Sequence, residues 1–307
     1  MEKIDRILNL QDLLEKKSHF LFGPRQSGKS FMIRQQLQGV PVIDLLESDT
    51  FLRLTSNPSL IREILPEKAP LAVIDEIQKV PALLDEVHLL IERRGMKFLL
   101  TGSSARKLRR QGVNMLGGRA RSRTLHPFIK KELGTIELNK ALHYGLIPSI
   151  HFSDDPAEDL KSYVNDYLKL EIAAEGLTKN LPAFSRFLEV AATTNGQISN
   201  YQSISSDASV AHTTVTEYFQ ILRETLIGRN LEPWRKTKKR KSVAKAKFYF
   251  FDTGVVRSIL GLNPIKPKSP DFGDTFEAYM HHELSAFVDY HSGMSLNYWR
   301  SSIFGRH

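Results

Sequence analysis

The stretch SHFLFGPRQSGKSFMIRQQL, residues 18–37, constrains the fold of this chain more than any other. Gly23, Gly28, Lys29 and Ser30 satisfy the spacing G-x-x-x-x-G-K-[ST]. In this pattern the glycines let backbone N–H groups wrap an anion, the lysine reaches the β- and γ-phosphates, and the hydroxyl binds Mg²⁺. The apolar run before the loop predicts a strand, and the run after it predicts a helix whose N-terminus adds partial positive charge.

The alternative to a phosphate loop is a glycine-rich turn that matches the pattern by chance, and the flanking strand and helix favour the phosphate loop. The residues that we expect to bind nucleotide are Gly23, Pro24, Arg25, Gln26, Ser27, Gly28, Lys29 and Ser30.

The composition describes a globular, basic chain. Among 307 residues there are 43 lysines and arginines against 34 acids, a net charge of +9 that attracts polyanions. The segment RKTKKRKSVAKAK, residues 235–247, carries much of this excess and contains no acid. The chain has no cysteine, which excludes disulfides and cysteine-ligated metals. Because no run is apolar and long enough for a membrane span or a signal peptide, we expect a cytoplasmic protein without membrane contact.

The first half of the chain alternates apolar β-type runs with helix-compatible stretches, which is typical of a parallel sheet covered by helices. The runs VPVIDLL, APLAVIDEI, MKFLLTGSS and RSRTLHPF join the strand before the phosphate loop, so we predict five strands that end near Phe128. The predicted fold class is therefore α/β.

An apolar strand that ends in Asp75 and Glu76 supplies the second chemical signal. Ligands of open α/β sheets bind at the carboxyl ends of the strands, so Asp75 is placed to hold the Mg²⁺ that Ser30 also contacts. The side chain of Glu76, one residue further on, points in a different direction from that of Asp75. A base that activates the attacking water would stand there. The alternative is that the two acids cap a helix beginning near Pro81.

Two weaker signals follow along the chain. The strand in FLLTGSSARKL brings Thr101, Ser103 and Ser104 to the same rim, where a hydroxyl could contact the γ-phosphate and the attacking water. A helix cap is the alternative for these hydroxyls. Arg119 follows two glycines. An arginine at such a position could stabilise transition-state charge in its own or a neighbouring subunit. The alternative is that Arg119 is a solvated surface residue.

Together these residues resemble the AAA-like ATPases of bacteria and archaea in which a P-loop domain precedes a C-terminal domain of unknown function. The resemblance is carried by GPRQSGKS, VIDEIQKVP, LLTGSS, LGGRA with LHPF, FYFFDTGVVRSIL and GDTFEAYMHHEL. It implies a five-stranded sheet with the phosphate-loop strand near its centre, and ATP with Mg²⁺ as ligands. The implied roles are phosphate and Mg²⁺ binding for Lys29 and Ser30, Mg²⁺ binding for Asp75, water activation for Glu76, γ-phosphate sensing for Ser103 and a finger for Arg119.

The resemblance also implies the order of the domains. We expect a P-loop ATPase domain over residues 1–134, a helical lid or linker over 135–180, a winged helix over 181–262 and a restriction-endonuclease-like α/β segment over 263–307. The last segment departs from the family, because Glu277 matches the first nuclease acid whereas the further acid and lysine are absent. We therefore expect a truncated segment without nuclease activity.

The expected winged helix begins with three short helices, of which the last opens on threonines that can cap it. Val215, Phe219 and Leu222 would form the buried face of this last helix. DNA would then meet residues 212–217, which are His212, Thr213, Thr214, Thr216 and Glu217 together with the buried Val215. A module that packs against protein is the alternative.

The basic run lies between LEPW and KFYFF, which we predict to be the two strands of the wing. Residues 235–247 would then form an exposed tip that contacts DNA phosphates in a salt-dependent manner. A solvated loop is the alternative. We expect His281 and His282, on an amphipathic helix, to be structural because they form no H-E-x-x-H pattern.

The leading hypothesis is Mg²⁺-dependent ATP hydrolysis coupled to movement of a basic winged helix in association with DNA. The alternative is a nucleotide-gated regulator that binds DNA or protein with negligible hydrolysis. A small-molecule phosphotransferase would need an acceptor pocket, for which the sequence contains no motif. An oligomer is compatible with either hypothesis.

Overall fold

The computed structural model describes residues 4–103, 105–106, 108, 115–168, 180–234, 245–291 and 293–299. The chain divides into two compact units. Unit 1 comprises residues 1–134 with 147–149 and 224–226, and unit 2 comprises residues 135–146, 150–223 and 227–307.

Unit 1 is built around a sheet of five strands in the order β2-β3-β4-β1-β5. Every neighbouring pair in this sheet is parallel. The strands are β1 (Ser18–Phe22), β2 (Val42–Asp44), β3 (Leu71–Asp75), β4 (Lys97–Gly102) and β5 (Ala120–Thr124). The predicted α/β class and five-stranded parallel sheet are confirmed, with the strand that precedes the phosphate loop in the interior of the sheet.

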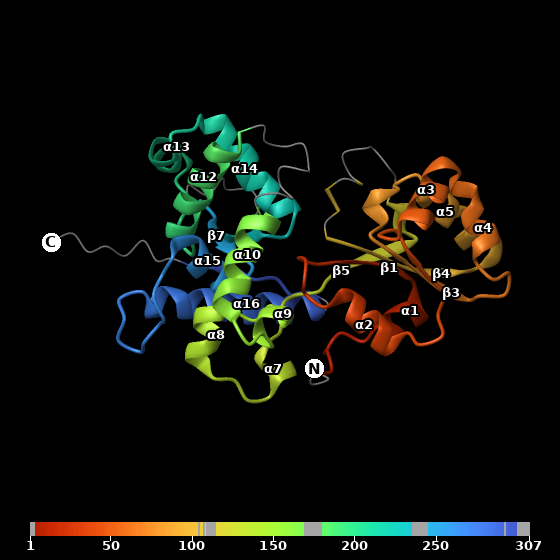
Figure 1. The fold of residues 1–307 in the computed structure, drawn as a ribbon, viewed down its shortest axis with the longest axis horizontal. Coiled ribbons are helices and arrows are strands. Elements are labelled where there is room, and N and C mark those ends of the chain that lie inside the picture. Colours follow the sequence, from red (N-terminus) through yellow and green to blue (C-terminus); the bar gives the residue numbers. More distant parts are fainter. Residues whose placement is uncertain are drawn as a thin grey trace. The chain divides into compact units, whose positions relative to one another are not determined.

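Helices cover both faces of this sheet. Figure 1 shows α3, α4 and α5 on one face and α1 and α2 on the other. The helical elements described in unit 1 are α1 (Leu10–Lys16), α2 (Lys29–Gln36), α3 (Ser48–Ser56), η1 (Pro58–Leu60), α4 (Ile61–Ile64), η2 (Ile77–Lys79), α5 (Leu83–Arg94), η3 (Leu116–Gly118) and α7 (Lys130–Leu133).

The buried strands of unit 1 follow from their sequence. All five residues of β1 are buried, as expected for an interior parallel strand that is covered on both faces. The α3–α5 face of the sheet packs into one apolar cluster that includes Phe20, Ile74, Phe98 and Leu54. By contrast, β5 lies at the sheet edge with exposed Arg121 and Ser122, and charged residues discourage edge-to-edge pairing.

Unit 2 begins with helical elements and continues into a helix-rich segment that contains three described strands. The elements described are α8 (Leu138–Tyr144), α9 (Pro148–His151), α10 (Pro156–Ser162), the π-helix η4 (Tyr163–Leu168), α12 (Leu181–Thr193), α13 (Tyr201–Ala208), α14 (His212–Glu224), β6 (Gly228–Pro233), β7 (Lys247–Phe250), α15 (Thr253–Leu260), α16 (Phe272–Tyr290) and β8 (Asn297–Tyr298). The first residues of α9 are assigned to unit 1, as are the last residue of α14 and the two that follow it.

The region predicted to be a winged helix contains three helices followed by an antiparallel pair of strands. The pair is formed by β6 and β7, and β8 then joins the other side of β6 in parallel. The first predicted strand was too short, because β6 begins at Gly228 rather than within LEPW. Residues 235–244, which are most of the predicted basic tip, lie outside the described residues.

Aromatic side chains form the core between α12, α14 and β7. Phe187 packs edge to face against Phe219, with ring centroids 5.0 Å apart, and Phe219 packs against Phe248 at 4.8 Å. The predicted buried face of α14 is confirmed, since Val215, Phe219 and Leu222 are each 0% exposed.

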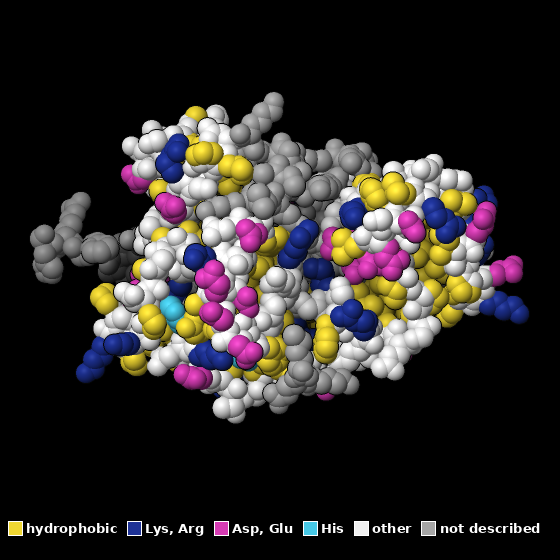
Figure 2. All heavy atoms as spheres, in the orientation of Figure 1, with side chains coloured by type: hydrophobic (Ala, Val, Ile, Leu, Met, Phe, Trp, Pro, Cys, Tyr) yellow, Lys and Arg dark blue, Asp and Glu magenta, His cyan; other side chains and the backbone are white. Residues whose placement is uncertain are grey.

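Charged side chains of both signs are interspersed on the face of the molecule drawn in Figure 2. The lysines and arginines coloured there form no single continuous basic field. In the part of the chain that the structure describes, no helix combines the length and apolarity that a membrane span requires.

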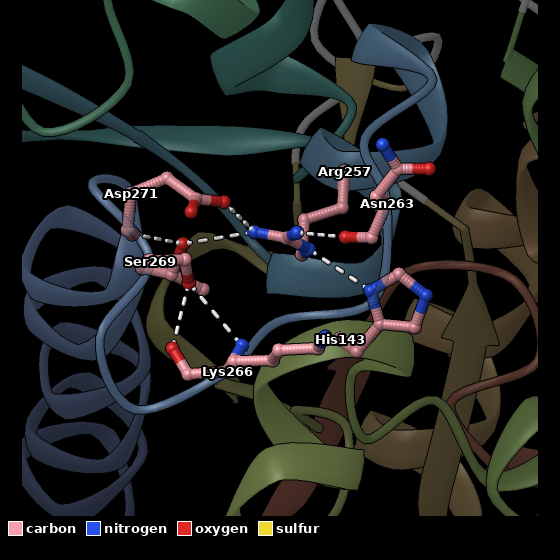
Figure 3. A network of polar contacts seen from close by, with 7 residues as sticks. His143, Arg257, Asn263, Lys266, Ser269 and Asp271 are labelled. Atoms are coloured by element: carbon pink, nitrogen blue, oxygen red, sulfur yellow. Dashed lines mark hydrogen bonds and ion pairs between the residues drawn. The ribbon is translucent and has the colours of Figure 1, made fainter.

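A buried arginine fixes α15 to its neighbours within unit 2. Figure 3 shows Arg257 between His143 and Asp271. Its Nε donates to His143 Nδ1 at 3.0 Å, and its other nitrogens donate to the Asp271 carboxylate and to the carbonyl of Asn263. Burial, together with the nearby guanidinium, lowers the pKa of His143. The neutral imidazole is therefore the form that accepts this hydrogen bond.

Candidate phosphate-binding site

The predicted phosphate loop connects the end of β1 at Phe22 to the start of α2 at Lys29. Both glycines of the loop occupy positions where a side chain would not fit the backbone. Gly28 has φ +93°, a left-handed conformation that side chains disfavour. A Cβ on Gly23 would lie 2.5 Å from the carbonyl oxygen of Leu125, so only glycine fits there.

Lys29 is buried with its ammonium directed into the loop. Its Nζ donates to the carbonyl oxygens of Gly23 at 2.7 Å and Pro24 at 3.2 Å. The lysine is thus already held where the loop curves, and its charge stands close to any anion that the loop binds. Ser27 Oγ is buried with no hydrogen-bond partner among the described residues.

The remaining loop residues differ in exposure. Arg25 and Gln26 are exposed, and Gln26 has a left-handed φ of 60°. Gln26 Oε1 accepts a hydrogen bond from Ser149 Oγ at 2.6 Å.

The end of β3 meets the start of α2 through Asp75. Ser30 Oγ donates to Asp75 Oδ2 at 3.0 Å, and Thr101 Oγ1 of β4 donates to Asp75 Oδ1. Asp75 is only 6% exposed. Ser30 and Asp75 thus lie in contact, and their role as ligands of Mg²⁺ stays a prediction.

This pair of oxygen donors fits a magnesium ion. Mg²⁺ is commonly held by one or two protein oxygens, with phosphate oxygens and water completing its shell. A hydroxyl and a carboxylate in contact provide such a partial set. No group of three or more His, Cys, Asp or Glu side chains suited to a metal occurs among the residues that the structure describes.

Glu76 follows directly after β3 in a left-handed conformation, with φ +59°. Its side chain makes no helix-capping hydrogen bond, and α5 begins later, after Ala82. The alternative that Asp75 and Glu76 serve as helix caps is therefore wrong. The Glu76 carboxylate accepts instead a hydrogen bond from Gln78 Nε2.

Ser103 lies one residue beyond β4, at the same rim. It is buried, and its Oγ is 3.4 Å from Gln78 Nε2. Ser104 lies outside the described residues, as do residues 107, 109 and 110 of the stretch ARKLRR that these hydroxyls were alternatively expected to cap.

Arg119 lies away from the phosphate loop. It precedes Ala120, which pairs with Ser18 at the amino end of β1, whereas the loop follows the carboxyl end of β1. Five residues at about 3.3 Å each separate the two edges by roughly 16 Å. Arg119 forms an ion pair with Glu92 of α5, which lowers the pKa of that carboxyl. Within one subunit, this position does not suit a finger.

The sequence analysis missed two residues that contact the site. One is Gln78, two positions after Glu76. The other is Arg6, which donates to the Ser27 carbonyl in the loop at 2.9 Å, to the His126 carbonyl at 2.6 Å and to Glu132 at 2.9 Å. Gln78 lies within the quoted stretch VIDEIQKVP, but its contacts, like those of Arg6, exist only in the folded chain.

The residues expected to meet DNA lie on α14 in unit 2. His212, Thr213, Thr216 and Glu217 are exposed, and Thr214 is partly exposed.

The structure also describes the contacts of Glu277 and the burial of His281 and His282, which the sequence analysis singled out in unit 2. Glu277 accepts hydrogen bonds from Lys247 at 2.7 Å and from the Tyr249 hydroxyl at 2.5 Å. His281 and His282 are buried, and His281 stacks on Tyr249 with ring centroids 3.9 Å apart. This setting agrees with the expected structural role of the histidines.

The parallel sheet, the loop between β1 and α2, and the acid at the end of β3 together agree with the fold of a P-loop NTPase. Residues 15–134 match the family described as "AAA domain", and residues 135–266 match a family described as "Domain of unknown function (DUF8612)".

Three relatives extend the similarity along the chain. Uncharacterized proteins of Mycobacterium tuberculosis and Mycobacterium bovis are each 26% identical over 310 residues, which covers 98% of this chain and 69% of the relative. An uncharacterized protein of Haemophilus influenzae is 24% identical over 296 residues, covering 84% of this chain and 74% of the relative.

One solved structure also aligns with this chain. It is a signal transduction ATPase with numerous domains (STAND) and a tetratricopeptide repeat sensor, from Pyrococcus horikoshii. The identity is 12%, and the alignment covers 94% of this chain and 46% of that chain. The chain thus spans less than half the length of that protein, and the TM-score of 0.29 is too low to carry an argument.

Proposed function

We propose that this chain is a Mg²⁺-dependent ATPase whose hydrolysis cycle moves a winged helix, residues 181–262, that engages DNA. The observation that supports the ATPase most directly is the contact of Ser30 with Asp75 at 3.0 Å, with Glu76 as the next residue. The contact brings a hydroxyl and a carboxylate suited to Mg²⁺ beside the phosphate loop, and a second carboxylate follows at the same strand end.

Each residue has a role in this proposal. Lys29 shifts its ammonium from the loop carbonyls to the β- and γ-phosphates of ATP. Ser30 and Asp75 hold Mg²⁺, which when bound neutralises charge on the phosphate oxygens. Glu76 accepts a proton from the attacking water, and the Ser103 hydroxyl donates to the γ-phosphate.

The test is phosphate release from ATP with Mg²⁺, measured for the unaltered protein and for Glu76→Gln. We expect Glu76→Gln to bind ATP but to lose turnover, because glutamine retains the shape of the side chain but does not accept the proton. Equal turnover in both proteins would refute the role of Glu76. ATP binding without turnover under any condition would favour the nucleotide-gated regulator instead.

DNA association is supported by the exposed face of α14, by the antiparallel strand pair that follows it and by the basic composition of residues 235–247. We expect duplex DNA to stimulate phosphate release at low salt and less at physiological salt, because contacts with phosphates weaken as counterions compete. A protein partner in place of DNA would leave turnover unchanged by DNA at both salt concentrations.

We also propose that Arg119 serves a neighbouring copy of the chain, because its own phosphate loop is at the other edge of the sheet. Mixing Arg119→Ala with Lys29→Ala tests this arrangement. Neither variant alone would turn over ATP, whereas mixed oligomers would contain sites with both residues intact. Full activity of Arg119→Ala by itself would refute the proposal.

A further inference from the structure

A single glutamine amide joins the two side chains to which the proposed hydrolysis assigns separate roles. Gln78 lies in the η2 turn and is 8% exposed. Its Nε2 donates to Glu76 Oε2 and also to Ser103 Oγ at 3.4 Å. The carboxylate after β3 and the hydroxyl after β4 are therefore connected through one side chain.

The chemistry of the contacts determines which way the amide faces. Its nitrogen meets two acceptors, whereas the opposite orientation would place a carbonyl oxygen against the Glu76 carboxylate. Gln78 Oε1 is buried and has no hydrogen-bond partner among the described residues. The contacts of the nitrogen, rather than those of the oxygen, thus account for the position of this amide.

The position of the Gln78 amide depends on the absence of a side chain at Gly102. A Cβ at Gly102 would lie 2.1 Å from Gln78 Oε1 and 3.0 Å from Gln78 Cδ, so any other residue would displace the side chain. Gly102 has no left-handed φ, and its backbone conformation therefore does not require glycine. The contact that an added Cβ would disturb at this position is therefore the one with the Gln78 amide.

We propose that Gln78 is a positioning residue that orients Glu76 for proton abstraction and links its position to that of Ser103. This inference rests on the proposed function, in which Glu76 activates the attacking water. The bond to Oε2 fixes the rotation of the carboxylate, so that Oε1 of the same group is presented to the water. Because Ser103 shares the amide, a shift of the hydroxyl at the γ-phosphate also moves the carboxylate.

The first variant is Gln78→Met, which keeps the length and volume of the side chain but removes the amide. It also removes the unpartnered carbonyl, so we expect the protein to fold normally. Loss of orientation should lower kcat about 10- to 100-fold. The affinity for a fluorescent ATP analogue should remain within about threefold, because the hydrogen bonds of the Gln78 side chain go to Glu76 and Ser103.

A double mutant separates positioning from a general structural effect. If Gln78 acts through Glu76, then Gln78→Met combined with Glu76→Gln should be no slower than Glu76→Gln alone. Losses that multiply in the double mutant, or a fall in affinity that parallels the fall in kcat, would overturn the inference.

Gly102→Ala is the second variant, since it displaces the amide while leaving Gln78 in the chain. Its kcat should fall in the same range as that of Gln78→Met. The matched control is Gly273→Ala, where a Cβ would meet nothing within 4 Å, and its turnover should equal that of the unaltered protein. Normal turnover of Gln78→Met and Gly102→Ala would overturn this inference alone. Absence of turnover in the unaltered protein would overturn the proposed function and this inference with it.

Discussion

Arg6 links the N-terminal segment to the phosphate loop through contacts that are almost entirely buried. The side chains of Arg6 and Glu132 are 3% and 0% exposed, and their ion pair measures 2.9 Å. Arg6 also donates to the carbonyl oxygens of Ser27 and His126. We predict that Arg6→Met strongly destabilises unit 1 although it conserves much of the side-chain volume.

The magnitude follows from the groups left behind. Breaking a buried ion pair by removing one partner costs about 3–5 kcal/mol, because the other charge stays buried without compensation. Glu132 keeps hydrogen bonds from the backbone N–H groups of Ile7 at 3.1 Å and Ile129 at 3.2 Å, which moderates the loss. Two carbonyls lose a donor, which adds to it. For a unit of this size, a loss of about 3–5 kcal/mol lowers the unfolding temperature by roughly 10–20 °C.

The positions of the tryptophans allow the assay to locate the effect. The chain contains only Trp234 and Trp299, and both belong to unit 2. Tryptophan fluorescence therefore reports on unit 2, whereas circular dichroism reports on the helices of both units. We expect Arg6→Met to lower a transition seen by circular dichroism more than the transition seen by fluorescence.

Two further variants test the electrostatic part of this reasoning. The double mutant Arg6→Met with Glu132→Gln should recover at least part of the loss, because no uncompensated charge remains. As a control, Arg62→Met removes an arginine whose side chain is 40% exposed in its pair with Glu86, and it should have a much smaller effect. An Arg6→Met shift below about 2 °C, or a double mutant less stable than Arg6→Met alone, would refute the argument.

Three other predictions concern single residues. Lys29→Ala should weaken ATP binding by more than about 100-fold in a fluorescent-analogue titration, since the ammonium inside the loop is lost; near-normal affinity would contradict the assigned role. Phe219→Ala should lower the free energy of unfolding of unit 2 by about 3–5 kcal/mol in urea, because Phe219 is 0% exposed and contacts several rings. Burial raises the pKa of Asp252 to about 6, so the folded chain holds this proton more tightly than the unfolded chain, and stability should fall by about 3 kcal/mol as the pH rises from about 4 to above 6. Asp252→Asn should flatten this part of the pH profile of tryptophan-monitored unfolding, and an unchanged profile would show that other groups cause it.

Features encoded by neighbouring residues could be predicted from the sequence. The loop from Gly23 to Ser30 is recognisable because its glycines, lysine and hydroxyl act at fixed spacing along the chain. Buried parallel strands appear as apolar runs, which is why β1, β3 and β4 were expected where they occur. The buried face of α14 followed from helical periodicity in the same way.

Features that depend on pairing between distant segments were decided only by the tertiary structure. The register of β5 against β1 places Arg119 at the edge opposite the phosphate loop, and no local pattern encodes that register. Arg6 meets Glu132 across 126 positions of the chain, and Gln78 meets Ser103 across 25. The sequence alone thus determined where the loop and the acidic strand end lie along the chain, and which residue types they contain. The fold decided which side chains orient them, because a buried hydrogen bond exists only once both partners have been brought together and removed from water.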